Sequence, residues 1–196
     1  LGIPTGSALG FAFPTPQDGG VYLGAFNTVL AREVNAALAE AGDDVIVQIE
    51  VPPELYAAYA FPEMMDQFAL GPIYDLLSKI TPGAQIGIHL CLGDFHNHAI
   101  VHAETLNTMV EFSNRLVAGF PPQHKLVYVH YPFAEGAVPP TTDAAYYEPL
   151  KNVNLPEGVR FIAGFVHEDR TLEENRAILA AIERARGQVV GVATSC

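Results

Sequence analysis

Segments typical of strands and segments typical of helices alternate along the whole chain, and this alternation limits the fold more than any other feature. Short apolar runs bounded by Gly or Pro predict strands, and apolar residues three and four positions apart predict helices. Six strands and five helices in strict alternation favour a parallel sheet with helical crossovers, an α/β fold. The predicted strands are 1–13 (running into a loop), 45–50, 85–91, 125–130, 160–166 and 188–196, and the predicted helices are 21–41, 62–80, about 99–118, 142–150 and 171–184.

Two architectures fit this alternation. One is an eight-stranded (β/α)₈ barrel, in which active sites lie at the C-terminal ends of the strands. The other is an open, doubly wound sheet. No G-x-G-x-x-G follows a predicted strand, so we do not expect a dinucleotide site.

Composition narrows the class of protein. The 196 residues fit one domain, and 49% hydrophobic against 16% charged residues indicates a globular chain rather than a disordered one. A net charge of −12 disfavours nucleic acid as a partner. No apolar run reaches the length of a membrane span and no signal segment opens the chain, so we expect a cytoplasmic protein without membrane contact. The chain starts at Leu1 and stops at Cys196 directly after a predicted strand, and we expect it to be part of a longer protein.

A histidine and a cysteine, His89 and Cys91, end the predicted strand 85–91. Residues two apart on a strand project to the same face, so an imidazole and a thiol lie side by side, and both are ligand types that zinc prefers. The second cysteine of the chain, Cys196, ends the last predicted strand. Together the three residues indicate a site on one rim of a parallel sheet. A disulfide between the two cysteines and inert core cysteines are the alternatives.

Further polar residues follow the ends of predicted strands. Glu50 closes an apolar strand and is a candidate to hold a substrate ammonium group, with a salt bridge or hydrogen bond to a loop as the alternative. Asp94, just past the histidine-cysteine pair, is a candidate to orient a ligand histidine or to contact substrate. Ser7 is a weaker candidate for substrate contact. His130 and His167 also end predicted strands.

Four of these segments, in order, resemble motifs of the C-terminal barrel of cobalamin-independent methionine synthase and its relatives. The likeness extends over nearly the whole chain. The segment V-I-V-Q-I-E-V-P-P-E-L at 45–55 resembles the family's I-Q-I-D-E-P-A-L, and I-H-L-C-L-G-D-F at 88–95 resembles its H-x-C zinc strand. F-V-H-E-D-R at 165–170 resembles D-I-H-S-P-R, and T-S-C at 194–196 resembles P-D-C.

The resemblance implies a (β/α)₈ barrel, of which residues 1–196 form a single partial domain with the first strands lying upstream. It also implies a zinc ion held by His89, Cys91 and Cys196. The family's fourth ligand is a glutamate at the place that His130 takes here, so either His130 replaces it or three protein ligands remain. The aspartate that binds the amino group of homocysteine is replaced by Glu50.

The activity implied is zinc-dependent alkyl transfer, as of a methyl group, to a zinc-activated thiol, with His167 donating a proton to the leaving group. The partners are a small thiol and an alkyl donor, with a corrinoid or a folate as methyl donor. The departures from the family's motifs favour a different thiol or methyl donor from those of methionine synthesis. Two alternatives stay open: a barrel enzyme that needs no metal, as in uroporphyrinogen decarboxylase, and a non-catalytic zinc-binding module.

Overall fold

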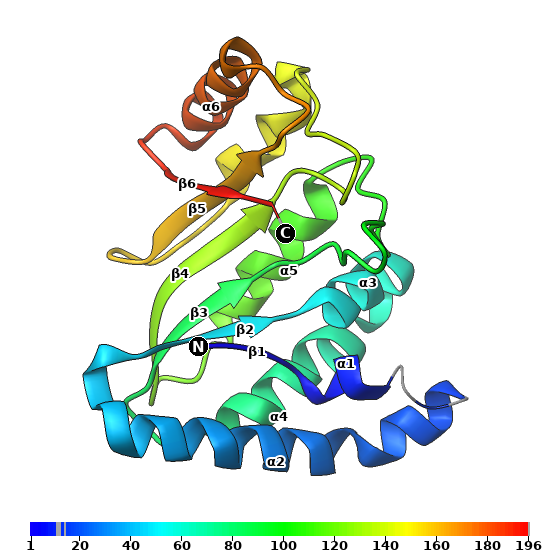
Figure 1. Cartoon of the computed structure of the whole chain (residues 1–196), viewed down its shortest axis with the longest axis vertical. Coiled ribbons are helices and arrows are strands. Elements are labelled where there is room, and N and C mark those ends of the chain that lie inside the picture. Colours follow the sequence, from blue (N-terminus) through cyan, green and yellow to red (C-terminus); the bar gives the residue numbers. More distant parts are fainter. Residues whose placement is uncertain (11–12, 14, 196) are drawn as a thin grey trace.

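A six-stranded, all-parallel sheet forms the centre of the computed structural model, which describes residues 1–10, 13 and 15–195 (Figure 1). The strands lie in the order of the sequence, so each one pairs with the next. They are β1 (Gly2–Pro4), β2 (Ile46–Glu50), β3 (Gln85–His89), β4 (Lys125–Pro132), β5 (Arg160–Val166) and β6 (Gly191–Thr194). This arrangement confirms the predicted α/β class and its parallel sheet, while closure into a barrel stays a prediction.

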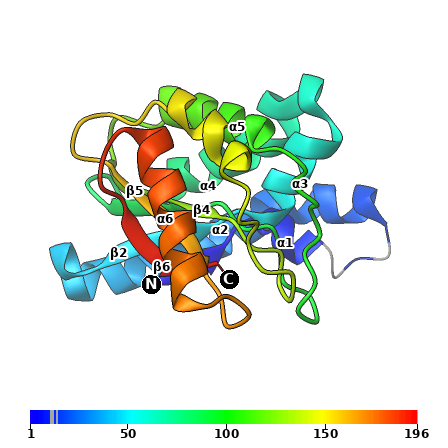
Figure 2. The same cartoon turned by 90° about the horizontal axis from the view of Figure 1, so that it is seen from above.

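Helices cover one side of this curved sheet. Consecutive parallel strands joined by crossovers of the same hand place their helices on one face. Figure 1 shows α2 below the strands, α5 behind them and α6 above them, and in Figure 2, seen from above, α5 lies toward the top of the picture and α6 in front of the strands. The α-helices are α1 (Gly6–Gly10), α2 (Pro16–Ala41), α3 (Pro52–Ala60), α4 (Gly71–Lys79), α5 (Asn107–Ala118) and α6 (Leu172–Arg186). Shorter turns of 3₁₀-helix occupy Gly42–Asp44, Pro62–Met64 and Ala144–Asn152, and a π-helical turn occupies Met65–Leu70.

Local sequence signals explain where the helices begin and end. The Thr171 side chain accepts a hydrogen bond from the Glu174 backbone N–H, and the Glu174 carboxylate accepts one from the Thr171 N–H, so the predicted capping box starts α6. Gly187, with φ at 68°, ends this helix in the left-handed conformation that glycine adopts without strain. At α2, the Thr15 side chain caps the Asp18 N–H, so the helix begins before the predicted residue 21.

The two faces of the sheet differ in what they carry. Alternate residues of the central strands, such as Ile49, Ile88 and Val129, are at most 1% exposed and form the core with the helices. The residues between them face the other side, where Gln48 and Tyr128 are only half-buried. Because the side-chain period of a strand is two, this division gives one face to packing and leaves the other to polar groups.

Several helical segments differ from their predictions, and the first is α1, which lies within the segment 1–13 that was predicted to be a strand running into a loop. Helix α3 was not expected, although paired prolines at its first turn are a helix-start signal. The predicted helix 62–80 is divided into a 3₁₀ turn, a π turn and α4, which begins at Gly71. Helix α5 begins at Asn107 rather than near residue 99, because most of the preceding residues form a loop at the C-terminal rim. Within the part of the chain that is described, no helix has the length and apolar character needed to span a membrane.

Candidate metal centre

A cavity of about 570 Å³ lies at the C-terminal ends of the strands, on the face opposite the helices. Five of the predicted site residues line it: Glu50, His89, Cys91, Asp94 and His130. The other lining residues are Gln48, Tyr128, Ile162, Ala193, Thr194 and Ser195. Side chains from β2, β3, β4, β5 and β6 therefore meet at one place, as expected for the rim of a parallel sheet.

Two histidines from neighbouring strands face each other in this cavity. His89 and His130 are register partners across β3 and β4, and their Nδ1 atoms lie 2.5 Å apart. Both rings are largely buried, at 6% and 8% exposure. Two nitrogen lone pairs repel at this distance, so the contact is a hydrogen bond in which one ring donates its Nδ1 proton to the other.

Cys91 joins the histidine pair from just beyond the end of β3. The Leu90 N–H donates to the His130 carbonyl at 2.9 Å, which continues the pairing with β4 by one residue beyond His89. The Cys91 side chain is buried, and its sulfur accepts a hydrogen bond from the Gly93 N–H at 3.3 Å. A cysteine binds metal as its thiolate.

The surroundings of His130 keep its ring neutral at ordinary pH. Burial, followed by the nearby His89, lowers the pKa of His130 to about 4, with the Thr194 backbone acting in the opposite direction. Gly164 on β5 gives the ring its space, because a Cβ atom there would lie 2.2 Å from His130 Nε2. A neutral imidazole is the form that ligates metal.

The donor chemistry of this cluster suits zinc, which binds imidazole nitrogen and thiolate sulfur. Among residues 1–10, 13 and 15–195, however, no three His, Cys, Asp or Glu side chains are arranged as a metal site. Cys196, a predicted ligand, lies outside these residues, and its place in the site stays a prediction. The described part therefore brings residues of the right chemistry, His89, Cys91 and His130, to one cavity without placing all three at metal-binding distance of a common point.

A chain of hydrogen bonds leads to Glu50 from the opposite wall of the cavity. Tyr128 donates from its hydroxyl to Gln48 Oε1 at 2.8 Å, and Gln48 Nε2 donates to Glu50 Oε1 at 3.1 Å. Gln48 lies on the same face of β2 as Glu50, two residues earlier. Its period-two spacing from Glu50 was the only signal in the sequence that pointed to this residue.

Ser7 lies away from the cavity, in α1, where it belongs to a buried polar cluster. The Ser7 N–H donates to Thr5 Oγ1 at 3.2 Å, and the Thr5 hydroxyl donates to Glu54 of α3. Complete burial raises the pKa of the Glu54 carboxyl to about 7, and the hydroxyls of Thr5 and Ser7 offset only part of this rise. The predicted substrate contact of Ser7 has no support from this position and stays a prediction.

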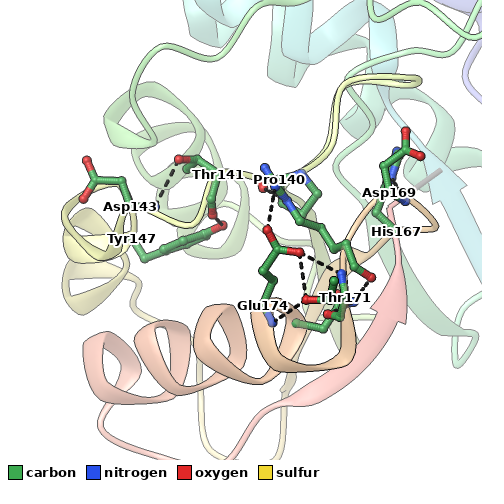
Figure 3. Close-up of polar contacts among 10 residues, drawn as sticks. Pro140, Thr141, Asp143, Tyr147, His167, Asp169, Thr171 and Glu174 are labelled. Atoms are coloured by element: carbon green, nitrogen blue, oxygen red, sulfur yellow. Dashed lines mark hydrogen bonds and ion pairs between the residues drawn. The ribbon is translucent and has the colours of Figure 1, made fainter.

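His167 also lies outside the residues that line the cavity. Its Nε2 bonds to the Gly136 carbonyl at 3.0 Å, and its Nδ1 accepts from the Asp169 N–H at 3.1 Å, a contact visible in Figure 3. The neutral tautomer with the proton on Nε2 satisfies both bonds. His167 thus joins two rim loops through backbone contacts, and its role as a proton donor stays a prediction.

Comparison with known proteins supports a relationship at the level of the fold. No family model matches the sequence, and no curated protein does. A solved structure from Listeria monocytogenes, described provisionally as a vitamin-B12 independent methionine synthase, is similar with a TM-score of 0.53 and 15% sequence identity. The match covers 100% of this chain and 56% of that protein. At this identity the likeness concerns the fold alone, so this chain shares the fold of about half of a methionine-synthase-like protein.

Proposed function

We propose that the chain holds a zinc ion at the cavity and transfers an alkyl group to a thiol bound there. The ligands in this proposal are His89, Cys91 and Cys196, with His130 in the place of the family's glutamate. The observation that carries it is that His89, Cys91 and His130, which carry ligand types that zinc prefers, line one cavity. Zinc, when bound, lowers the pKa of a thiol and keeps it as a thiolate near neutral pH.

The other residues of the cavity suit a small polar thiol. Glu50 and Asp94 place carboxylates beside the histidine pair, and carboxylates accept hydrogen bonds from a cationic group. The cavity of about 570 Å³ has room for a small thiol together with the transferred group of its donor. Proton donation to the leaving group by His167 belongs to this proposal as a prediction. A corrinoid or a folate as the methyl donor is likewise a prediction within this proposal.

Metal content tests the proposal directly. The full chain, purified without chelators, should contain about one zinc per molecule. His89→Ala and Cys91→Ser should lose it, whereas His102→Ala should retain it, because the His102 side chain is 74% exposed on a rim loop. A wild-type protein without zinc would contradict the proposal and favour a metal-free barrel enzyme of the uroporphyrinogen decarboxylase type.

The place of His130 has its own test. His130→Glu installs the glutamate that the resemblance implies at this position. This variant should keep zinc if residue 130 is a zinc ligand. His130→Ala should then bind zinc more weakly than either protein. Equal zinc affinity in all three would show that His130 is not a ligand.

An open coordination position separates catalysis from a purely structural metal site. Cobalt substituted for zinc reports its ligands through its visible spectrum. Addition of a thiol should change that spectrum if a position is open. An unchanged spectrum would indicate a closed four-ligand site and the non-catalytic zinc-binding module.

A further inference from the structure

The ring of Tyr128 crosses the strand beside its own. A Cβ atom at Gly87 of β3 would lie 2.1 Å from Tyr128 Cζ, so the ring occupies the space that any other residue there would fill. β3 lies between β2 and β4, and the ring therefore carries its hydroxyl from β4 to Gln48 of β2, 2.8 Å away. Only glycine at position 87 leaves room for the Tyr128 ring to make this contact.

The direction of each hydrogen bond follows from the chemistry of Glu50. A carboxylate only accepts hydrogen bonds, so the amide nitrogen of Gln48 must face it. The amide oxygen then faces the other way and accepts from the Tyr128 hydroxyl. Removal of that hydroxyl would take away the partner that holds the oxygen end of the Gln48 amide, so the amide would be held less firmly against the carboxylate.

We propose that Tyr128 and Gln48 are positioning residues that hold Glu50 for the cationic group of an aminothiol substrate. Oε1 of Glu50 accepts from Gln48, and the other carboxylate oxygen serves the substrate. This inference rests on the proposed thiol site. It adds the residues that determine which thiol binds there.

The sheet geometry limits the size of the substrate. Glu50 and His89 are register partners on adjacent strands, so their backbones lie about 4.8 Å apart. The proposed positions of the sulfur and of the ammonium group therefore lie on adjacent strands, within reach of one small molecule.

Prior positioning matters because a glutamate side chain is flexible. It has three rotatable bonds, and its freedom is lost when it binds a ligand. A carboxylate already held by Gln48 loses less on binding, and this difference appears as affinity for the ammonium group. The phenol of Tyr128 is well suited to the task, because its rigid ring turns about only two bonds.

A matched pair of thiols tests this positioning. The full zinc-loaded chain is titrated by calorimetry with 2-aminoethanethiol and with propane-1-thiol, which has a methyl group in place of the ammonium. The wild type should prefer the aminothiol. Tyr128→Phe should weaken aminothiol binding about five- to tenfold, the worth of one hydrogen bond, and leave propane-1-thiol unchanged. The control is Tyr131→Phe, which removes a hydroxyl from the other face of the same strand.

A double-mutant cycle distinguishes the hydrogen-bonded chain from two unrelated contacts. Gln48→Met keeps the length of the side chain and removes its amide, so it should weaken aminothiol binding by a similar factor. Because Tyr128 acts only through Gln48, Tyr128→Phe in the Gln48→Met background should have no further effect. Additive losses would overturn the inference. Gln48→Met alone still tests it if Tyr128→Phe does not fold.

The outcomes separate this inference from the proposed function. A wild type that holds no zinc contradicts both. A wild type that holds zinc and binds both thiols, with a preference that neither Tyr128→Phe nor Gln48→Met changes, overturns only the positioning roles. A preference lost in both variants, with zinc content unchanged, supports them.

Discussion

The two faces of β4 use similar side chains for different purposes. On the helix side, Tyr131 is fully buried, stacks on Phe161 with ring centroids 4.4 Å apart and bonds through its hydroxyl to Ser113 of α5. On the cavity side, Tyr128 lies over Gly87 and bonds to a polar side chain. One tyrosine fills volume in the core, and the other carries a hydroxyl across the sheet.

The helix face and the cavity face of the sheet are therefore under different structural constraints. The helix face must match the volume of the helices, so its residues are large and apolar. The cavity face needs empty space beside its polar groups, and glycines provide it: Gly87 admits the Tyr128 ring and Gly164 admits His130. Substitutions on the helix face should therefore change stability, and those on the cavity face should change binding.

The largest expected effect concerns the helix face of β3. Ile88 is completely buried there, and Ile88→Ala should lower the free energy of unfolding by about 2–5 kcal/mol through lost burial and a cavity. Urea unfolding measures this loss. His89→Ala, the next residue on the opposite face, should cost less stability and remove zinc binding instead. Equal losses of stability in the two variants would contradict the expected difference between the two faces of the sheet.

A second prediction concerns Glu54, which is buried in the helix layer, whereas Glu50 lies in the cavity. The pKa of Glu54 is about 7 in the folded protein against 4.5 ordinarily, so the folded state binds the proton more tightly. Its stabilising contribution is full below pH 4.5 and is lost as the pH rises to about 7. The loss should approach roughly 3 kcal/mol.

Chemical denaturation between pH 4 and pH 8 measures the Glu54 contribution. Glu54→Gln stays neutral at every pH, so its stability should change less across this range than that of the wild type. At pH 8 the variant should be the more stable of the two proteins. An identical pH profile for the two would show that Glu54 titrates normally in the fold.

A smaller effect is expected for Gly87→Ala on the cavity face. The added Cβ atom would displace the Tyr128 ring at a cost of about 1–3 kcal/mol, as overpacking usually does. Combining it with Tyr128→Ala should remove most of that cost, because the ring is the obstacle. Unfolding free energies of the two single variants and the double variant give the coupling. Additive costs would refute the close approach.

The smallest effect is expected for Tyr131, the tyrosine on the helix face of β4. Tyr131→Phe should lower the free energy of unfolding by about 1 kcal/mol, because it leaves the Ser113 hydroxyl without this partner in the core. Zinc content should not change. A loss of zinc in this variant would mean that the helix face also controls the cavity.

Sequence patterns were sufficient for the α/β class and for the parallel sheet. Apolar runs such as 45–50 and 160–166 coincide closely with β2 and β5, because a buried parallel strand leaves a continuous apolar signature. The grouping of His89, Cys91 and His130 in one cavity followed from their places at strand ends.

The parts that sequence reasoning did not reach depend on contacts between distant residues. The partnership of Tyr128 with Gln48 requires a glycine on the strand between them, a relation that no local pattern records. His167 ends a strand as expected, but its ring nitrogens contact backbone groups of rim loops rather than the cavity. Helix α3 was missed because its two prolines also suit a loop.

The sequential order of the strands also affects which parts of the sheet unfold locally in solution. Among the described residues, β3 and β4 have paired strands on both sides, whereas β1 and β6 each pair on one side. The amide hydrogens of the middle pair should therefore be among the slowest to exchange. His89 and His130 belong to that pair. The two histidines would thus stay together through brief local openings elsewhere in the fold.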